Sequence, residues 1–133
     1  MRLLLDTNAY SALLRGSEAV ATRVRKAHSI LFSTVVAGEL LYGFRNGSRY
    51  VSNREQLEAF LANPYVTLIP VTLNTADRFG LIASALRKNG TPIPVNDIWV
   101  AAQGLESGAD LLSFDAHFRH VAGLSLIHLT DPD

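Results

Sequence analysis

Residues 2–8 read Arg2-Leu3-Leu4-Leu5-Asp6-Thr7-Asn8, a short apolar run that stops at three polar side chains. A continuous apolar run of this length is typical of a strand that is buried on both faces of a sheet. Thr7 or Asn8 can cap a helix that continues through Leu14 and ends at Gly16. The stretch therefore predicts a strand followed directly by a helix, with an acid at the point where the strand ends.

The same alternation continues along the rest of the chain. Strand-like apolar runs occur at 30–32, 66–69, 110–113 and 125–129, and helical patterns occur at 18–27, 35–44, 54–61, 75–88 and 97–107. Capping residues precede several of these helices, namely Ser17, Ser52 or Asn53, Thr72 or Asn74, and Asn96. Strands that alternate with helices predict right-handed crossovers and a parallel sheet covered on both faces, which is an α/β fold.

Length and composition predict one globular domain over residues 1–133. The chain is 48% hydrophobic and 18% charged, and no repeat or Gly/Ser linker divides it. It has no cysteine, which excludes disulfides, zinc–thiolate centres and thiol nucleophiles. No apolar run approaches the ~18 residues that span a bilayer. We therefore expect a soluble, cytoplasmic protein with no membrane partner.

The formal net charge is zero, whereas nucleic-acid-binding proteins are usually basic. The charges are unevenly distributed, however, because residues 1–54 carry a net charge of +5 and the remainder carries −5. Such asymmetry is compatible with a basic face beside an acidic site, although scattered surface charges explain it equally simply. The charge balance alone does not exclude RNA as a partner.

Three acids are predicted to lie near one edge of the sheet, and a fourth can reach it. Asp6 ends the first strand, Asp115 lies just past the fourth, and Glu39 lies on the helix after the second. Asp97 begins a helix and can reach the same edge. In parallel sheets, ligands bind beyond the carboxyl ends of the strands. The sequence therefore predicts a cluster of carboxylates at a position where ligands commonly bind.

Clustered carboxylates repel one another, and a divalent cation removes that conflict. Oxygen ligands suit hard ions such as Mg²⁺ or Mn²⁺, which promote displacement at a phosphodiester. Each acid also has an ordinary structural explanation. Asp97 suits the first turn of a helix, Asp6 suits a turn, and Asp115 suits a surface loop, whereas Glu39 stands among non-polar neighbours.

At this point four segments of the chain resemble a known family. They carry the four acids in order, and they span residues 3–8, 33–43, 90–102 and 111–118. The sequence resembles the PIN-domain ribonucleases, and among them the VapC-type toxins of prokaryotic toxin–antitoxin pairs. Ser113 stands where threonine is frequent in that family, which keeps a hydroxyl group at this position.

The resemblance implies a three-layer α/β/α sandwich with a mostly parallel sheet of about five strands. It also implies endonucleolytic cleavage of RNA that depends on Mg²⁺ or Mn²⁺. The implied catalytic residues are Asp6, Glu39, Asp97 and Asp115. Asp6 and Asp97 would bind metal directly, and Glu39 and Asp115 would bind it directly or through water. Thr7, Asn8 and Ser113 would position carboxylates, water or phosphate around them.

The resemblance also implies partners: an antitoxin protein that inhibits the toxin, a second copy in a homodimer, and DNA only through the antitoxin. Two non-catalytic alternatives stay open. A receiver-like signalling module would need neighbouring acids at the N-terminus and a late lysine, and a PIN-like binding module would have lost its chemistry. His117 and His120 form an H-x-x-H pair, for which a loop or surface role is expected.

Overall fold

The computed structural model describes residues 1–130, and a five-stranded sheet lies at its centre. The strands are β1 (Arg2–Leu5), β2 (Ser29–Ser33), β3 (Val66–Ile69), β4 (Asp110–Ser113) and β5 (Leu126–His128). They are ordered β3-β2-β1-β4-β5, and every neighbouring pair is parallel. The chain therefore builds the sheet outward from β1 in one direction, and then returns to build the other half.

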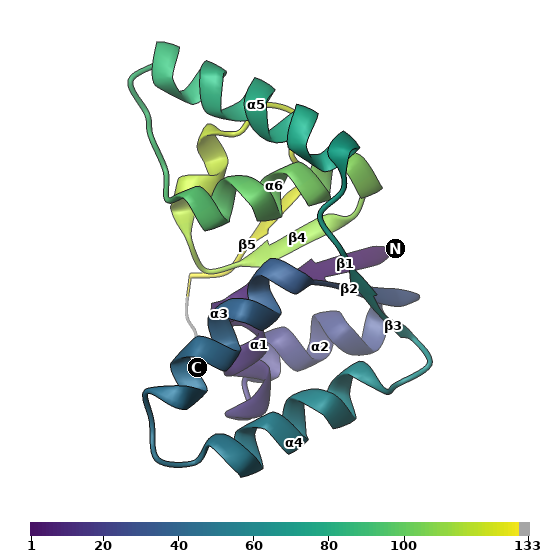
Figure 1. Cartoon of the computed structure of the whole chain (residues 1–133). Coiled ribbons are helices and arrows are strands. Elements are labelled where there is room, and N and C mark those ends of the chain that lie inside the picture. The colour runs from purple at the N-terminus through teal and green to yellow at the C-terminus, as the bar shows by residue number, and fades with distance from the viewer. Residues whose placement is uncertain (131–133) are drawn as a thin grey trace.

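Helices cover both faces of the sheet (Figure 1). They are α1 (Thr7–Leu14), α2 (Glu18–Lys26), α3 (Thr34–Arg45), α4 (Tyr50–Leu61), α5 (Leu73–Lys88) and α6 (Val95–Ser107), with a 3₁₀ helix η1 (Ala116–His120) after β4. Helices α1 to α4 lie on one side, and α5 and α6 lie on the other. The predicted three-layer α/β/α fold is confirmed. Parallel strands need crossover connections, and here the crossover helices lie on both faces of the sheet.

The central strands are buried as their apolar pattern predicts. Leu3, Leu4 and Leu5 of β1 are fully buried, as are Leu111 and Leu112 of β4. Each such side chain contributes about 1.5–3 kcal/mol through removal of apolar surface from water. This rigid centre fixes the positions of the residues that follow the two strands.

Aromatic side chains pack against both faces of the sheet. Tyr10, Phe32 and Phe60 contact one another edge to face, with ring centroids 5.2–5.5 Å apart. On the opposite face Phe79 of α5 stacks on Trp99 of α6 at 4.1 Å. Trp99 therefore joins the two helices that cover this face.

Two of the expected helix starts are wrong. The helix expected from 54 begins at Tyr50, where the Arg49 carbonyl accepts the backbone N–H of Asn53 at 3.0 Å. The Tyr50 hydroxyl accepts hydrogen bonds from both Arg45 (2.9 Å) and Arg54 (2.7 Å) at this turn between α3 and α4. Asn96 does not cap α6. The Pro94 carbonyl accepts the backbone N–H of Asp97, so the helix already includes Asn96.

The cap of α1 also differs from the expectation. Asp6, rather than Thr7 or Asn8, is the N-cap, and its Oδ1 accepts the backbone N–H of Ala9 at 2.9 Å. Its backbone is extended, as a cap requires, whereas Thr7 and Asn8 already belong to the helix. The first acid of the sequence thus ends a strand and begins a helix at once.

Within residues 1–130, no helix has the length and apolar character needed to cross a membrane.

Candidate metal centre

The four acids lie around the carboxyl ends of β1 and β4, the two adjacent central strands. These strands are not consecutive in the chain, so the connections diverge here, at a topological switch point of the kind where α/β proteins bind ligands. Leu5 pairs with Leu112, and this register sets Asp6 beside Ser113. The site therefore depends on a strand pairing between the beginning and the end of the chain.

Asp6 is held rigidly at the centre of the site. Only 7% of the residue is exposed, and both carboxylate oxygens are engaged, Oδ1 by the Ala9 N–H and Oδ2 by the Ser113 hydroxyl. Burial raises the pKa of Asp6, the hydrogen bonds from Ser113 and Ala9 oppose that rise, and the charges of Asp115 and Glu39 add to it. A nearby cation would offset this cost of holding Asp6 ionised.

Asp97 lies in the first turn of α6 and is half-buried. Its pKa is raised to about 6, mainly by burial and then by the charges of Asp115, Glu39 and Asp6, while His117 lowers it. Interactions of this kind weaken with distance. The structure places ligand atoms of Asp97 and Asp115 within 4.8 Å of each other, and Glu39 and Asp6 lie near enough for their charges to act on Asp97. The roles of the four acids as ligands stay a prediction.

Glu39 reaches the site from α3. The side chain is partly buried, and its Oε1 accepts a hydrogen bond from the Thr7 hydroxyl at 3.1 Å. Thr7 thus holds a carboxylate oxygen of Glu39, while the positioning role that the resemblance implies for Thr7 in catalysis stays a prediction. Asn8, in contrast, is exposed on α1.

Ser113 links the first and fourth acids. Its hydroxyl donates to Asp6 and accepts the backbone N–H of Asp115 at 2.9 Å. Asp115 in turn caps η1, because its Oδ1 accepts the backbone N–H of His117 at 2.8 Å. The His117 ring lies beside the same oxygen, with Nδ1 at 3.1 Å. A chain of contacts therefore runs from Asp6 to His117.

A hydrogen bond from His128 of β5 also fixes the loop that carries Asp115. His128 Nδ1 accepts a hydrogen bond from Arg119 at 2.9 Å, which leaves Nε2 protonated to donate to the Phe114 carbonyl at 3.1 Å. The sequence interpretation missed this contribution, because no local pattern relates residue 128 to residue 114. Only the pairing of β4 with β5 brings them together.

The donor set fits a hard divalent cation. Asp97, Asp115 and His117 each offer one ligand atom, and these atoms lie within 4.8 Å of one another. With Asp6 and Glu39 close by, the site concentrates negative charge that a cation would neutralise. Carboxylate oxygens are the usual protein ligands of Mg²⁺ and Mn²⁺. The arrangement is therefore suited to binding a metal ion and an anionic substrate together.

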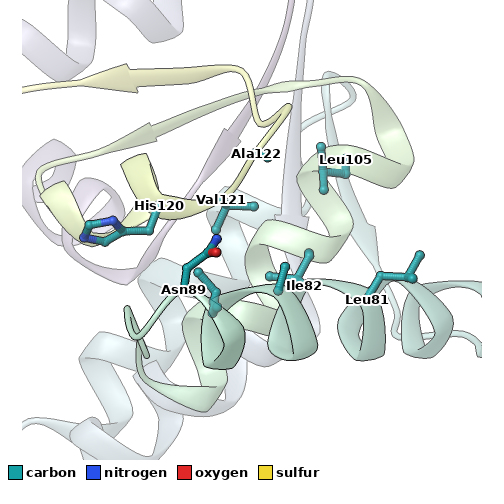
Figure 2. A pocket seen from close by; sticks show the side chains of 9 residues that line it. Leu81, Ile82, Asn89, Leu105, His120, Val121 and Ala122 are labelled. Atoms are coloured by element: carbon teal, nitrogen blue, oxygen red, sulfur yellow. The ribbon is translucent and has the colours of Figure 1, made fainter.

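A pocket of about 230 Å³ between α5 and the segment after η1 is distinct from this centre. Its lining is mostly aliphatic, with Asn89 and His120 as polar members (Figure 2). None of the four acids lines it. The two histidines of the H-x-x-H pair thus lie in different environments, since His117 contacts Asp115 and His120 lines this pocket.

Comparison with known proteins identifies the family of this chain. The sequence profile of the family described as PIN domain matches residues 3–124. Ribonuclease VapC2 of Haemophilus influenzae is 30% identical over 115 residues, which are 85% of this chain and 86% of that protein. Ribonuclease VapC1 of the same species is 26% identical over 129 residues, covering 93% and 95% of the two chains.

Solved structures show the same fold. VapBC-1 from nontypeable Haemophilus influenzae has a TM-score of 0.86 at 24% identity and covers 98% of this chain and 100% of its own. VapBC2 from Rickettsia felis, bound to a DNA fragment from its promoter, has a TM-score of 0.85 at 21% identity and covers 97% and 99%. By its sequence profile and its 30%-identical relative, this chain belongs to the PIN domain family, alongside the VapC ribonucleases.

Proposed function

We propose that this protein is an endoribonuclease that depends on Mg²⁺ or Mn²⁺ and acts as the toxin of a toxin–antitoxin pair. The observation that carries the proposal is the convergence of Asp6, Glu39, Asp97 and Asp115 at the divergent edge of the sheet. Relatives named as ribonucleases and as VapC proteins support the same activity.

Asp6 and Asp97 are the proposed direct metal ligands, and Glu39 and Asp115 bind directly or through water. A divalent ion at this site supplies charge neutralisation for a phosphodiester and makes a water molecule more acidic. Glu39 is positioned by Thr7 to accept a proton from the attacking water. Ser113 fixes the Asp6 carboxylate and the Asp115 backbone at once, so that the ligands are oriented before the ion arrives.

The test is cleavage of a mixed RNA pool by the purified protein. We expect cleavage with Mg²⁺ or Mn²⁺, none with EDTA, and loss of activity by at least about 100-fold in Asp6→Asn and Asp97→Asn, since each variant loses a charged ligand. Asp77→Asn is a matched control because Asp77 is an exposed aspartate on α5, outside the site. Full activity in EDTA, or in Asp97→Asn, would contradict the proposal.

The non-catalytic alternatives give a different result in the same experiment. A PIN-like binding module would bind the ion and cleave no RNA. A receiver-like module would accept phosphate from a small phosphodonor, and a direct labelling experiment with such a donor detects that reaction. The relatives named as ribonucleases favour catalysis over both alternatives.

An antitoxin protein is the proposed inhibitor, with contact to DNA made only through that partner. The neighbouring structures named VapBC support a protein partner, and two of them contain DNA. Tyr42 on α3 is 72% exposed and Leu14 on α1 is 45% exposed. This side of the molecule therefore presents apolar surface that a partner protein could cover. Addition of the protein encoded by the adjacent gene should stop cleavage at an equimolar ratio.

We also propose that the active protein is a homodimer. Light scattering coupled to size-exclusion chromatography tests this directly, since the 14.5 kDa chain would elute with about 29 kDa, twice its monomer mass. A monomer that still cleaves RNA would contradict the dimer and leave the activity intact.

A further inference from the structure

The proposed mechanism leaves one side chain at the metal centre without a role. His117 lies on η1, and 59% of its side chain is exposed. Its Nδ1 is 3.1 Å from Asp115 Oδ1, and one of its ring nitrogens lies within 4.8 Å of carboxylate oxygens of both Asp97 and Asp115. A neutral ring nitrogen in this position is a third potential ligand that differs in kind from the carboxylates.

The backbone fixes the place of this ring. Asp115 caps η1 by accepting the backbone N–H of His117, so the α-carbon of His117 is held beside the carboxylate. The Asp115 backbone is in turn anchored by the Ser113 hydroxyl. The ring therefore stays near the two acids even though it is largely exposed to solvent.

The separations match those of ligands that share one ion. With metal–ligand bonds of about 2.1 Å, two ligand atoms lie roughly 3 Å apart when they are adjacent in an octahedron and roughly 4.2 Å apart when they are opposite. The Asp115–His117 distance of 3.1 Å agrees with the adjacent value, and the 4.8 Å bound on all three pairs is compatible with either arrangement.

We propose that His117 is a nitrogen ligand of the metal centre and that it makes the site prefer Mn²⁺ to Mg²⁺. This inference rests on the proposed function, because it concerns the ion of the same site. Mg²⁺ is a hard ion that is held by oxygen, whereas first-row transition ions accept imidazole together with carboxylates. One nitrogen among oxygen ligands therefore raises the affinity for Mn²⁺ and contributes little to the affinity for Mg²⁺.

The deciding experiment is pulsed electron paramagnetic resonance of the Mn²⁺-loaded protein, combined with binding titrations of Mn²⁺ and Mg²⁺. We expect the wild type to show ¹⁴N modulation from a coordinated ring nitrogen. His117→Ala should lose that modulation and bind Mn²⁺ about tenfold more weakly or worse, with Mg²⁺ binding changed by less than about twofold. The exposed ring makes few packing contacts, and a melting curve verifies that the variant folds.

His120→Ala is the matched control, because it removes the other exposed histidine of η1, which lines the separate pocket (Figure 2). This control should retain the modulation and the Mn²⁺ affinity. Absence of ¹⁴N modulation in the Mn²⁺-loaded wild type would overturn the proposal, as would equal losses of Mn²⁺ and Mg²⁺ affinity in His117→Ala.

The outcomes also separate this proposal from the proposed function. Mn²⁺ bound through oxygen alone in a protein that cleaves RNA contradicts the assignment of His117 and supports the nuclease. ¹⁴N modulation in a protein that cleaves no RNA supports the assignment and contradicts the nuclease. A wild type that binds neither ion and leaves RNA intact contradicts both.

Discussion

Replacement of Asp97 by asparagine should stabilise the metal-free protein while it abolishes metal-dependent cleavage. The pKa of Asp97 is raised to about 6 from an ordinary value of 3.8, first by burial and then by three neighbouring carboxylates. Above pH 6 the folded protein therefore carries a charge that it would hold more easily when unfolded. Asparagine has nearly the same shape and removes that charge.

The magnitude follows from the pKa shift. A shift of about two units corresponds to roughly 3 kcal/mol at 1.36 kcal/mol per unit. Because Asp97 is only half-buried and solvent screens it, about 1–2 kcal/mol is the expected gain in the free energy of unfolding. In a domain of this size, such a gain raises Tm by roughly 3–8 °C.

The pH dependence gives the sharper test. Below about pH 3 the wild-type Asp97 is protonated in the folded and the unfolded states, so the two proteins should have equal stability. The wild type should lose stability relative to the variant as the pH rises from 3 to 6, and the difference should stay constant above 6. Thermal melts in EDTA across this range measure the effect, with Asp77→Asn as a control that shows no such trend.

Addition of the ion should reverse the order of stability. An ion at 100 times its Kd stabilises the folded protein by about 2.7 kcal/mol, which exceeds the gain expected from the substitution. The wild type should then melt above Asp97→Asn. The reasoning is refuted if the variant is less stable than the wild type in EDTA at pH 7.5, or if its advantage persists unchanged at pH 3.

Substitutions at three positions test other parts of the structure. Ser113→Ala should weaken metal binding by about 10–100-fold in a titration, because it frees the Asp6 carboxylate and the Asp115 backbone, whereas Ser113→Thr should retain binding. Asp6→Asn should keep the cap of α1, because the amide oxygen can still accept the Ala9 N–H. Asp6→Ala should have a free energy of unfolding about 1 kcal/mol lower than that of Asp6→Asn, measured by urea unfolding. Tyr10→Phe should raise stability by about 1 kcal/mol in the same assay, because the buried hydroxyl has no hydrogen-bond partner within residues 1–130 and burial raises its pKa to about 12. Equal metal affinity of Ser113→Ala and Ser113→Thr, or equal stability of Asp6→Asn and Asp6→Ala, would contradict these expectations. Destabilisation by Tyr10→Phe would contradict the third.

Much of the fold could be predicted because local pattern and tertiary structure agree. Short apolar runs became parallel strands, and the residues between them became helices. The errors lie at helix boundaries, where a backbone carbonyl or an unexpected neighbour begins the helix instead of the expected capping side chain. At the start of α4 the Arg49 carbonyl accepts the backbone N–H of Asn53, and no rule for helix caps anticipates that start.

In the candidate site, too, the sequence predicts some features and only the folded structure reveals the others. The rule that ligands bind beyond the carboxyl ends of parallel strands grouped Asp6, Glu39 and Asp115 and left the place of Asp97 open. It did not reveal that Asp6 would itself cap α1, or that Ser113 would join two acids through one hydroxyl. The role of His128 depends on the pairing of β4 with β5, which no spacing in the sequence encodes.

The bond between Ser113 and Asp6 joins residues that are 107 positions apart in the chain. At 5–20 residues per second, a ribosome needs roughly 5–20 s after it has made Asp6 before it adds Ser113. Throughout that interval β1 lacks its β4 neighbour, so the acidic centre is incomplete and any cleavage that depends on it cannot begin. The strand order therefore means that the acidic centre is assembled only after most of the chain has been made.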